Sequence, residues 1–372
     1  MALIIKNETD IGDFIRGLTL YGVGGGGNPV LGFARIKEIL EKNGVVELVD
    51  PESIPDDEWT CSVFGMGSIA PVADRPGAYG QQARETKDPN VRALAELEAM
   101  TGKKIGAVVA FEPGGLNTTI ALHAGAMLDR KLVDGDYAGR AVPELCQTTP
   151  AILGKDMMPF VICDDWGNIL HILHTAGPAA LEAIGKQVSV ITKAPDKYAI
   201  CAHAGMILSA AEMKACVVPH TMSKAAAVGR AIREANERGT DAPEAAARAM
   251  GGRVLFRGTA AGSEWQSGGY MRGYSRFTGT GPNEGSDFQI WLQNENHLAW
   301  RDGCVVAMSP DVIAVVRAAD GEPITNSVLK KGDEVAVLGA PHKALRTKAA
   351  VELLGPRHFG FALDYSEIET LW

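Results

Sequence analysis

The chain has 372 residues, of which 46% are apolar and 22% charged, and its formal net charge of −9 at pH 7 comes from interspersed acidic and basic residues. This length predicts two domains, and the scattered charges, without any run of basic residues, argue against a surface for nucleic acid or an anionic membrane. The N-terminal apolar run MALII is too short for a secretory signal, no stretch reaches the length of a spanning helix, and the six dispersed cysteines, with no C-x-x-C pair, indicate reduced thiols in a cytoplasmic protein.

Helices and strands are expected to alternate through the first half of the chain. Pro29–Asn43 has apolar residues near helical period and follows Asn28, which can cap it, whereas Ile105–Phe111 is a continuous apolar run typical of a strand buried on both faces. The other expected helices are Asp10–Arg16, Val91–Met100 and Thr118–Leu128, and the other expected strands are Val45–Val49, Cys61–Phe64, Lys131–Val133 and Pro159–Cys163. Such alternation predicts a layered α/β domain with a largely parallel sheet.

The second half has a different pattern. Helices are expected at about residues 223–250, and short strands separated by turn residues follow from Arg253 onward. The clearest of these strands are Phe288–Gln293, Cys304–Met308, Val312–Arg317 and Glu334–Leu338. Glycine-rich stretches such as GSEWQSGGYMRGY are typical of the bulges and corners of a barrel. We therefore predict an α/β domain over residues 1–165, ending in the turn-like DDWGN, and a β-rich, barrel-like domain over residues 166–372.

A run of four glycines precedes the helix expected at Pro29. The stretch YGVGGGGNP contains the spacing G-x-G-x-x-G, a helix follows, and Asp50 ends the next strand, as in a dinucleotide-binding fold. The preceding residues LTLY, however, match poorly the buried strand which that motif requires. We therefore expect no NAD and favour a loop whose backbone N–H groups face another polar or anionic ligand. A purely structural turn is the remaining alternative.

The stretch FEPGGLN joins the apolar strand that ends at Phe111 to the next helix. Ligands collect at the carboxyl ends of strands in open α/β sheets, so Glu112 and Asn117 are expected to face such a crevice. The structural alternative is that Asn117 caps the helix and that Glu112 is solvated.

A second group of ionisable residues lies in VDGDYAGRAVPEL. Gly139 and Pro143 disfavour a continuous helix, so we expect a loop that carries Asp136 and Arg140, followed by a helix with Glu144 in its first turn. Two acids and an arginine can form a polar site with an activated water, or an internal ion-pair network that only stabilises the loop. Both interpretations are open at this stage.

The histidines give one further candidate. His171 and His174 would point to opposite faces of a strand, which argues against a shared metal. His358 lies in the aromatic stretch LLGPRHFGFALDY, where it is either a packed core residue or a functional acid–base group. The sequence contains no zinc signature, no G-x-S-x-G elbow and no Walker lysine. Motifs alone therefore indicate a two-domain protein with a polar site in its first domain.

Six stretches follow one another in a specific order: GVGGGGNP, GMGSIAPV, EPGGLN, DGDYAGRAVPEL, QIWLQNENHLAWRDG, and GPRHFGF with Asp364 and Tyr365. In this order they resemble the S-methyl thiohydantoin desulfurase family, over nearly the whole chain from about Ile11. The resemblance implies hydrolysis of S-methyl thiohydantoins to hydantoins and methanethiol, by proteins often encoded beside or fused to hydantoinase-type enzymes. It also implies a three-layer α/β N-terminal domain and a β-barrel-like C-terminal domain.

Two departures from the family pattern bear on the substrate more than on the reaction class. The family's D-G-x-G-R-A-F-P-E run has Tyr137, Ala138 and Val142 at its variable and Phe positions in this chain. The glycine loop, which often ends in Asp-Pro in the family, ends here in Asn28-Pro29, so one carboxylate is lost.

The implied reaction needs a base or a metal to activate water, a donor for the ring nitrogen, and donors for the ring carbonyl. We expect Glu112 or Asp136 to be the base or a metal ligand. Arg140 is expected to stabilise negative charge, Glu144 to orient Arg140, and His358 to be the acid. The expected substrate-binding groups are the backbone N–H groups of Gly24, Gly25, Gly26 and Gly27 and the side chains of Asn28 and Asn117. A divalent metal, with zinc best suited to the chemistry, is suspected.

Two other functions are compatible with the same residues. One is hydrolysis of a different cyclic amide or urea at the same polar site, and the other is a non-catalytic role as the partner subunit of a hydantoinase-type enzyme. The expected partners are thus a small-molecule substrate or a hydantoinase, and neither nucleic acid nor a membrane. A homo-oligomer is compatible with the β-rich second half.

Overall fold

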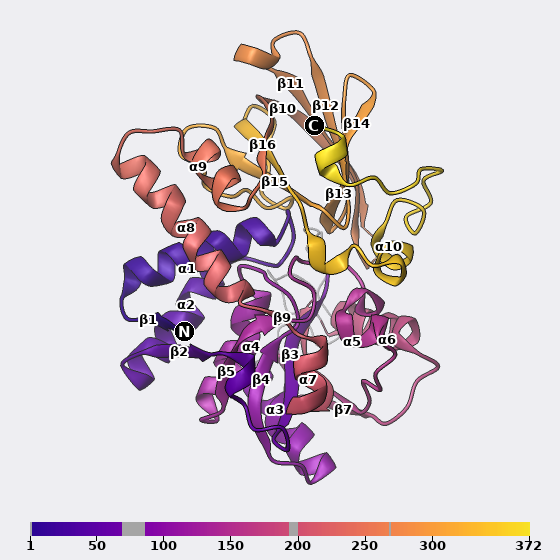
Figure 1. The fold of residues 1–372 in the computed structure, drawn as a ribbon. Coiled ribbons are helices and arrows are strands. Elements are labelled where there is room, and N and C mark those ends of the chain that lie inside the picture. Colours follow the sequence, from indigo (N-terminus) through magenta and orange to yellow (C-terminus); the bar gives the residue numbers. More distant parts are fainter. Residues whose placement is uncertain (1, 69–85, 193–199, 268) are drawn as a thin grey trace.

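The computed structural model describes residues 2–68, 86–192, 200–267 and 269–372. Within these ranges the chain forms two β-sheets, one above the other in Figure 1, and the lower sheet lies among helices. No helix in the described ranges is both long and apolar enough to cross a bilayer. The stretch GMGSIAPV continues past Ser68 into residues outside the described ranges.

The first sheet has nine strands in the described residues, in the order β1-β2-β5-β4-β3-β8-β6-β7, with β9 paired to β5. The strands in this order are β1 (Leu3–Ile5), β2 (Val46–Val49), β5 (Lys131–Asp136), β4 (Ile105–Ala110), β3 (Trp59–Gly67), β8 (Ile200–Ser209), β6 (Phe160–Cys163), β7 (Ile169–Ile172) and β9 (Val218–Pro219). Strands β2, β5, β4 and β3 run parallel, whereas β1, β8, β6, β7 and β9 pair antiparallel. The parallel sheet predicted from the sequence is therefore present only at the centre.

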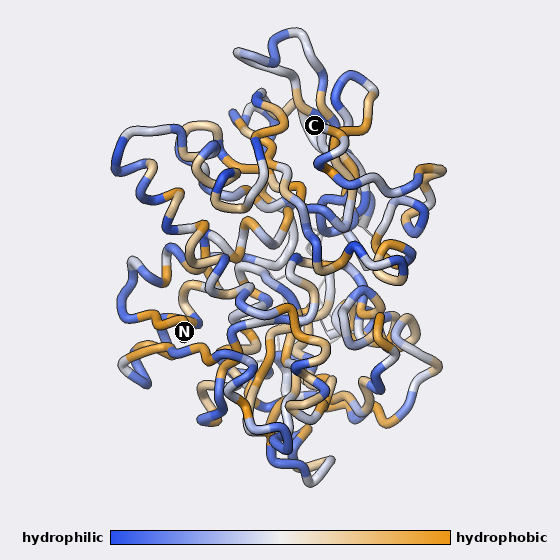
Figure 2. Tube along the Cα trace, in the orientation of Figure 1, coloured by the Kyte–Doolittle hydropathy of each residue, from blue (hydrophilic) through white to orange (hydrophobic). Residues whose placement is uncertain are grey.

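Helices cover both faces of this sheet, so the first part of the chain has three layers. One face packs against α1 (Glu8–Tyr21), α2 (Pro29–Asn43), α3 (Pro89–Thr101) and α4 (Asn117–Met127), and the other against α5 (Thr149–Ile152), α6 (Pro178–Ile191), α7 (Ala210–Cys216) and α10 (Lys348–Leu354). Strand β4 shows the alternation: Val108 packs with the first group and Val109 with the second. Figure 2 shows apolar residues along the central strands and hydrophilic residues at the outer turns. The three-layer prediction is confirmed.

The second sheet is antiparallel throughout, with seven strands in the described residues in the order β14-β13-β12-β11-β10-β16-β15. They are β10 (Arg253–Ser267), β11 (Met271–Gly279), β12 (Asp287–Gln293), β13 (Glu295–Arg301), β14 (Cys304–Met308), β15 (Val312–Arg317) and β16 (Glu334–Ala340). Register shifts in the β10–β11, β12–β13 and β13–β14 pairings bend the strands. The sheet therefore curls, and β13 and β14 contact β15 at its other end. The barrel-like prediction is thus confirmed as a half-barrel.

Helices α8 (Thr221–Glu237) and α9 (Ala242–Ala249) connect the two sheets and confirm the helices expected at about residues 223–250. Helix α8 crosses α1 closely, because glycines remove side chains from both helices: a Cβ on Gly17 would lie 1.8 Å from Ala225 O, and one on Gly229 would lie 1.8 Å from Asp13 O. The ion pair between Arg233 and Asp13 (2.9 Å) adds to this contact.

The boundary predicted at residue 165 does not separate the two sheets. Strands β7, β8 and β9 all lie beyond it and hydrogen-bond within the first sheet, and the chain reaches the second sheet only at Arg253. The turn DDWGN joins β6 to β7 as an antiparallel hairpin inside the first sheet. The turn signal thus marks a hairpin of the first sheet, and the domain boundary near residue 165 stays a prediction.

Candidate functional site

A pocket with a cavity volume of roughly 70 Å³ lies where the two sheets meet. Its lining comes from the glycine loop, the ends of β3 and β4, the start of α4, the segment 142–145, helix α6, and the residues at the start of β13. The lining residues with polar side chains, among those the structure describes, are Ser68, Glu112, Asn117, Glu144, Glu182, Lys186, Asn294 and Glu295. The apolar lining includes Phe64 and Phe111, whose ring centroids are 4.4 Å apart.

The floor of the pocket is a contact between two glycine-rich loops. A Cβ on Gly26 would lie 2.6 Å from Gly114 Cα, and one on Gly114 would lie 2.7 Å from Gly26 Cα, so neither position can carry a side chain without movement of the backbone. The carbonyl of Gly26 accepts hydrogen bonds from the N–H groups of Leu116 (2.9 Å) and Asn117 (3.1 Å), which begin α4. The sequence repeats glycine here because two backbones meet at this point.

Two of the four consecutive glycines contribute backbone donors to the pocket. Gly26 and Gly27 line it, and their N–H groups donate to no other described residue. Gly25 instead makes room for a neighbouring acid, since a Cβ there would lie 1.8 Å from Glu295 Oε1. The carbonyl of Gly24 accepts a hydrogen bond from Asn326 N (2.8 Å). Free amides of this kind bind a carbonyl oxygen or an anion.

The surroundings of the glycine loop are wrong for a dinucleotide motif. The residues LTLY belong to α1, so the loop joins two helices and the buried strand which that motif requires is absent from residues 8–28. Asn28 lies outside the pocket lining and caps α2, because its Oδ1 accepts from Val30 N at 2.9 Å. The expected helix at Asp10–Arg16 is thus longer than its sequence pattern indicated.

Glu112 and Asn117 form a hydrogen-bonded pair inside the pocket. Glu112 Oε1 accepts from Asn117 Nδ2 (2.8 Å), its Oε2 accepts from Val142 N (2.6 Å), and Asn117 Oδ1 accepts from Gly65 N (2.8 Å). Burial raises the pKa of Glu112 to about 7, although the hydrogen bonds from Val142 and Asn117 oppose the shift. Asn117 therefore orients Glu112, and its side chain makes no capping bond for α4.

Glu295 was not found from the sequence. It is 3% exposed, lines the pocket beside Gly25, and its Oε2 has no hydrogen-bond partner among the described residues. Burial is the main cause that raises its pKa well above the ordinary value, and the neighbouring Glu112 adds to the shift. A buried carboxyl group held neutral in this way can donate a proton at neutral pH. Glu295 was missed because QIWLQNENHLAW has the alternation of an ordinary strand, in which a glutamate is expected to face solvent.

Glu144 and His358 form a pair that the sequence did not predict, because the C-terminal segment folds back onto the first domain. Glu144 lines the pocket, and His358 lies outside the lining, with its Nε2 2.8 Å from Glu144 Oε2. Glu144 Oε1 accepts from Gln293 Nε2 at 2.9 Å. Burial raises the pKa of Glu144, but the hydrogen bonds from His358, Gln293 and Cys146 outweigh it, so the pKa lies below the ordinary value. Glu144 is thus an ionised acceptor, and it contacts His358 instead of orienting Arg140.

A second group that sequence reasoning missed lies on α6. Glu182 and Lys186 are both buried and both line the pocket, and Lys186 Nζ is 3.3 Å from Glu182 Oε1. Tyr270, at the turn between β10 and β11, donates its O–H to Glu182 Oε1 at 2.5 Å. The spacing of four residues on a helix is a weak signal for an ion pair, and nothing in the sequence indicated that this face of α6 is buried against the second sheet.

Asp136 and Arg140 lie outside the pocket lining. Asp136 ends β5, and its Oδ1 accepts from Ala138 N (2.6 Å) and Gly139 N (2.5 Å), which holds the following turn. Its Oδ2 has no partner in the described residues, and burial raises its pKa to about 6. The expectation that Asp136 faces the same crevice as Glu112 is not met.

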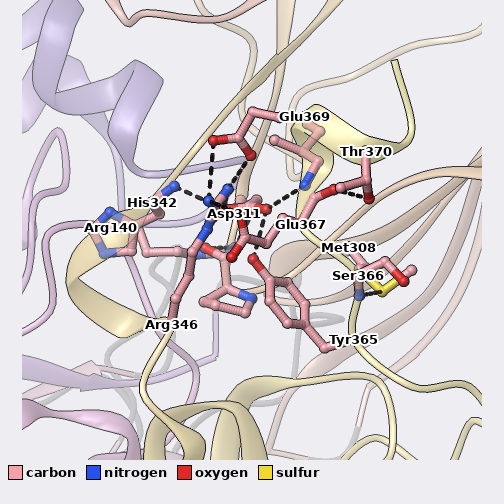
Figure 3. A network of polar contacts seen from close by, with 12 residues as sticks. Arg140, Met308, Asp311, His342, Arg346, Tyr365, Ser366, Glu367, Glu369 and Thr370 are labelled. Atoms are coloured by element: carbon pink, nitrogen blue, oxygen red, sulfur yellow. Dashed lines mark hydrogen bonds and ion pairs between the residues drawn. The ribbon is translucent and has the colours of Figure 1, made fainter.

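Arg140 is fully buried and binds backbone carbonyls instead of a carboxylate. Its guanidinium donates to the carbonyl oxygens of Ala141 (3.0 Å), Asn296 (2.9 Å) and Asp311 (2.9 Å). Figure 3 shows Arg140 beside Asp311, around which the C-terminal segment gathers. Burial lowers the pKa of Arg140, and the nearby Glu295, Asp311 and Glu112 raise it. Arg140 thus acts on the pocket only through its charge.

The suspected zinc ion finds no ligand set in the described part of the pocket. Among the described residues, the one group of three potential ligands close enough to share an ion is Glu38, Asp88 and His123, on the side of the sheet covered by α2, α3 and α4. There Lys87 already pairs with Glu38 (3.1 Å), and His123 Nδ1 lies 3.1 Å from Asn90 Nδ2. The pocket residues that the structure describes therefore offer no such ligand set for zinc.

The sequence matches two family models that together span most of the chain. They are described as the S-Me-THD-like N-terminal domain, matched over residues 9–174, and the S-Me-THD-like C-terminal domain, matched over residues 181–368. No curated protein matches the sequence. A crystal structure of a protein from Chromobacterium violaceum is similar, with a TM-score of 0.73 and 21% identity, over 98% of this chain and 100% of that one. At this identity the similarity shows the fold alone.

Proposed function

Because the chain belongs to the S-Me-THD-like family, we propose that it is a hydrolase which adds water to the ring carbon of an S-methyl thiohydantoin and releases methanethiol. The observation that carries the proposal is the pair of buried carboxyl groups, Glu112 and Glu295, in one pocket. Burial raises the pKa of both, that of Glu112 to about 7 and that of Glu295 well above its ordinary value, and the neighbouring Glu112 adds to the shift of Glu295. Two buried acids that disfavour each other's ionisation can divide the roles of base and acid.

The pocket suits a small planar ring with one polar edge. In an S-methyl thiohydantoin the reacting carbon is bonded to the methylthio sulfur, to a ring nitrogen with a lone pair, and to a ring N–H. The amides of Gly26 and Gly27 can donate to the ring carbonyl, and the aromatic wall of Phe64 and Phe111 can pack on the ring face. The ionised Glu144 can accept the ring N–H, and the bond from His358 holds it in place.

Water addition then requires two proton transfers. Glu112, in its ionised form, takes a proton from water as the oxygen bonds to the ring carbon. The electrons of the C=N double bond move to the ring nitrogen, which takes a proton from Glu295. Collapse of the tetrahedral centre forms the carbonyl, returns the hydroxyl proton to Glu295 and breaks the carbon–sulfur bond. The proton held by Glu112 leaves in methanethiol, so substrate and water yield hydantoin and thiol with both acids reset.

The test is the rate of methanethiol release from S-methyl thiohydantoin, measured with a thiol reagent, with hydantoin ring opening followed in parallel. Wild type should release thiol, and Glu112→Gln should lower kcat/KM by about 100-fold, because the base is lost while a hydrogen-bonding side chain remains. The matched control is Glu47→Gln, an exposed glutamate on β2, which should leave the rate unchanged.

Two outcomes would contradict the proposal. Ring opening of hydantoin without thiol release would assign the site to a cyclic-amide hydrolase. Absence of both reactions in the wild type, together with stimulation of a hydantoinase by added protein, would make the chain a non-catalytic partner subunit.

A further inference from the structure

Lys186 is the one cationic side chain among the described residues that line the pocket. Its side chain is 8% exposed, and lysine at such depth is rare unless it is paired. Its Nζ lies 3.3 Å from Glu182 Oε1, 3.3 Å from the centroid of the Tyr270 ring and 3.2 Å from the carbonyl oxygen of Gly269. The ammonium group is therefore held in position from two elements, α6 and the turn before β11.

The ammonium still has hydrogen atoms for a ligand. Glu182 is already committed: its Oε1 accepts from Tyr270 O–H (2.5 Å) and its Oε2 from Leu145 N (2.8 Å). Within the described residues, the hydrogen bond of Lys186 itself is the one to Gly269 O. The contact with Glu182 is a long ion pair, and the contact with Tyr270 is made to the ring face. The ammonium has three N–H donors, and these contacts do not occupy all of them.

The proposed reaction creates a charge that the carboxyl groups cannot stabilise. When the carbon–sulfur bond breaks, both electrons stay on sulfur, and an alkyl thiolate is a poor leaving group. At this step Glu112 holds the proton taken from water and Glu295 takes up the hydroxyl proton, so neither offers a positive charge, and Glu144 is ionised and would repel an anion. A cation in the same pocket stabilises such an anion far more strongly than it would in water, because the dielectric constant of the pocket is lower.

We propose that Lys186 is a catalytic residue which protonates the departing sulfur, and that Glu182 and Tyr270 position it. This inference rests on the proposed hydrolysis of S-methyl thiohydantoins. The carbon–sulfur bond breaks, the electron pair on sulfur takes a proton from Lys186 Nζ, and the neutral amine takes up the proton that Glu112 received from water. The sum is unchanged, with one water consumed and one thiol released.

The electrostatic surroundings support this role. Burial lowers the pKa of Lys186, while the neighbouring acidic groups, Glu182 foremost, oppose the shift. The group is thus a stronger acid than a solvated lysine, and it remains paired with an acid that favours its charged form. Proton donors with pKa values closer to neutrality transfer protons more effectively at neutral pH.

The test compares two leaving groups on the same ring. With S-methyl thiohydantoin, Lys186→Met should lower kcat by about 100-fold, whereas with the S-(4-nitrophenyl) analogue, whose thiolate leaves without protonation, the loss should be less than about threefold. Lys186→Arg keeps the positive charge and the ion pair but is a much weaker acid, so it should fold and show the same selective loss.

A purely structural role for Lys186 would lower turnover of both substrates alike, and that result, or full activity of Lys186→Met on the S-methyl compound, would overturn the inference while leaving the proposed hydrolysis intact. Wild-type protein that turns over neither substrate would remove the proposed function, and this inference with it.

Discussion

Two buried carboxyl groups in this molecule, Glu295 and Asp311, have opposite surroundings. The carboxylate of Asp311 accepts five hydrogen bonds, from His342 N (2.8 Å), Arg346 Nε (3.0 Å) and Nη2 (2.8 Å), Tyr365 O–H (2.9 Å) and Ile368 N (2.9 Å). Glu295 leaves one oxygen without a partner in the described residues. Both are essentially inaccessible, so burial alone does not distinguish them.

The difference separates a structural acid from a reactive one. A buried charge is tolerated when it is paired and hydrogen-bonded, and Asp311 meets both conditions through Arg346. Glu295 has no such pairing, because its Oε2 lacks a hydrogen-bond partner among the described residues. It is therefore held in its neutral form, and this oxygen is available to a ligand. Figure 3 shows the consequence for the fold: His342, Arg346 and Tyr365, which are far apart in the sequence, lie around Asp311.

The largest effect is expected from removing the satisfied acid. Asp311→Ala orphans the backbone N–H groups of His342 and Ile368 and removes the 2.8 Å partner of Arg346, a half-buried guanidinium that keeps its ion pairs with Glu367 and Glu369. We expect the free energy of unfolding, measured by urea denaturation, to fall by about 3–5 kcal/mol. Tyr365→Phe, which removes a single neutral donor to the same carboxylate, should cost only about 1 kcal/mol. Equal, small losses in both variants would show that Asp311 is not the structural centre of this segment.

Asp136 sharpens the comparison, because one of its oxygens is also unpaired but lies outside the pocket. Its pKa is raised by burial from 3.8 to about 6, so the folded state binds its proton more tightly than the unfolded state does. The contribution of Asp136 to the free energy of unfolding, ~2–3 kcal/mol, is therefore fully present below about pH 4 and is lost as the pH rises through about 6. Asp136→Asn keeps the acceptor for Ala138 N and Gly139 N but cannot ionise.

The measurement is urea denaturation of both proteins from pH 4 to pH 7. The stability of the wild type should fall relative to Asp136→Asn as the pH increases, and thiol release per folded molecule should stay within about threefold of wild type because Asp136 does not line the pocket. Parallel stability curves, or a loss of turnover as large as that of Glu112→Gln, would contradict this assignment.

The sequence was most informative where one stretch contains both the structural element and its polar residues. FEPGGLN predicted the crevice position of Glu112 and Asn117, because a strand end, a glycine pair and a helix start are all local signals. The same holds for the helices at residues 223–250 and for the half-barrel, whose strands are short and separated by turns.

The rest of the site depends on contacts that no local pattern records. Glu295 fits into the pocket only because Gly25, far away in the sequence, leaves space beside it. Lys186 faces the pocket only because the turn at Tyr270 covers α6. In contrast, the acids of VDGDYAGRAVPEL suggested a site by composition, yet Asp136 and Arg140 hold a turn and bind carbonyl groups. A cluster of charged residues in the sequence thus shows where charges are concentrated, but it does not show which way their side chains point.

The most direct test of the account is the infrared spectrum of the folded protein near pH 7, in the region where the C=O stretch of a protonated carboxyl group absorbs. Because Glu295 is held neutral inside the pocket, wild type should show such a band, to which Glu112, with a pKa raised to about 7, also contributes. Glu295→Gln should therefore weaken the band by the share of one carboxyl group, whereas Asp311→Asn should leave it unchanged. An identical band in the wild type and in Glu295→Gln, or no band in either, would mean that Glu295 is ionised and that the acid of the proposed reaction is not there.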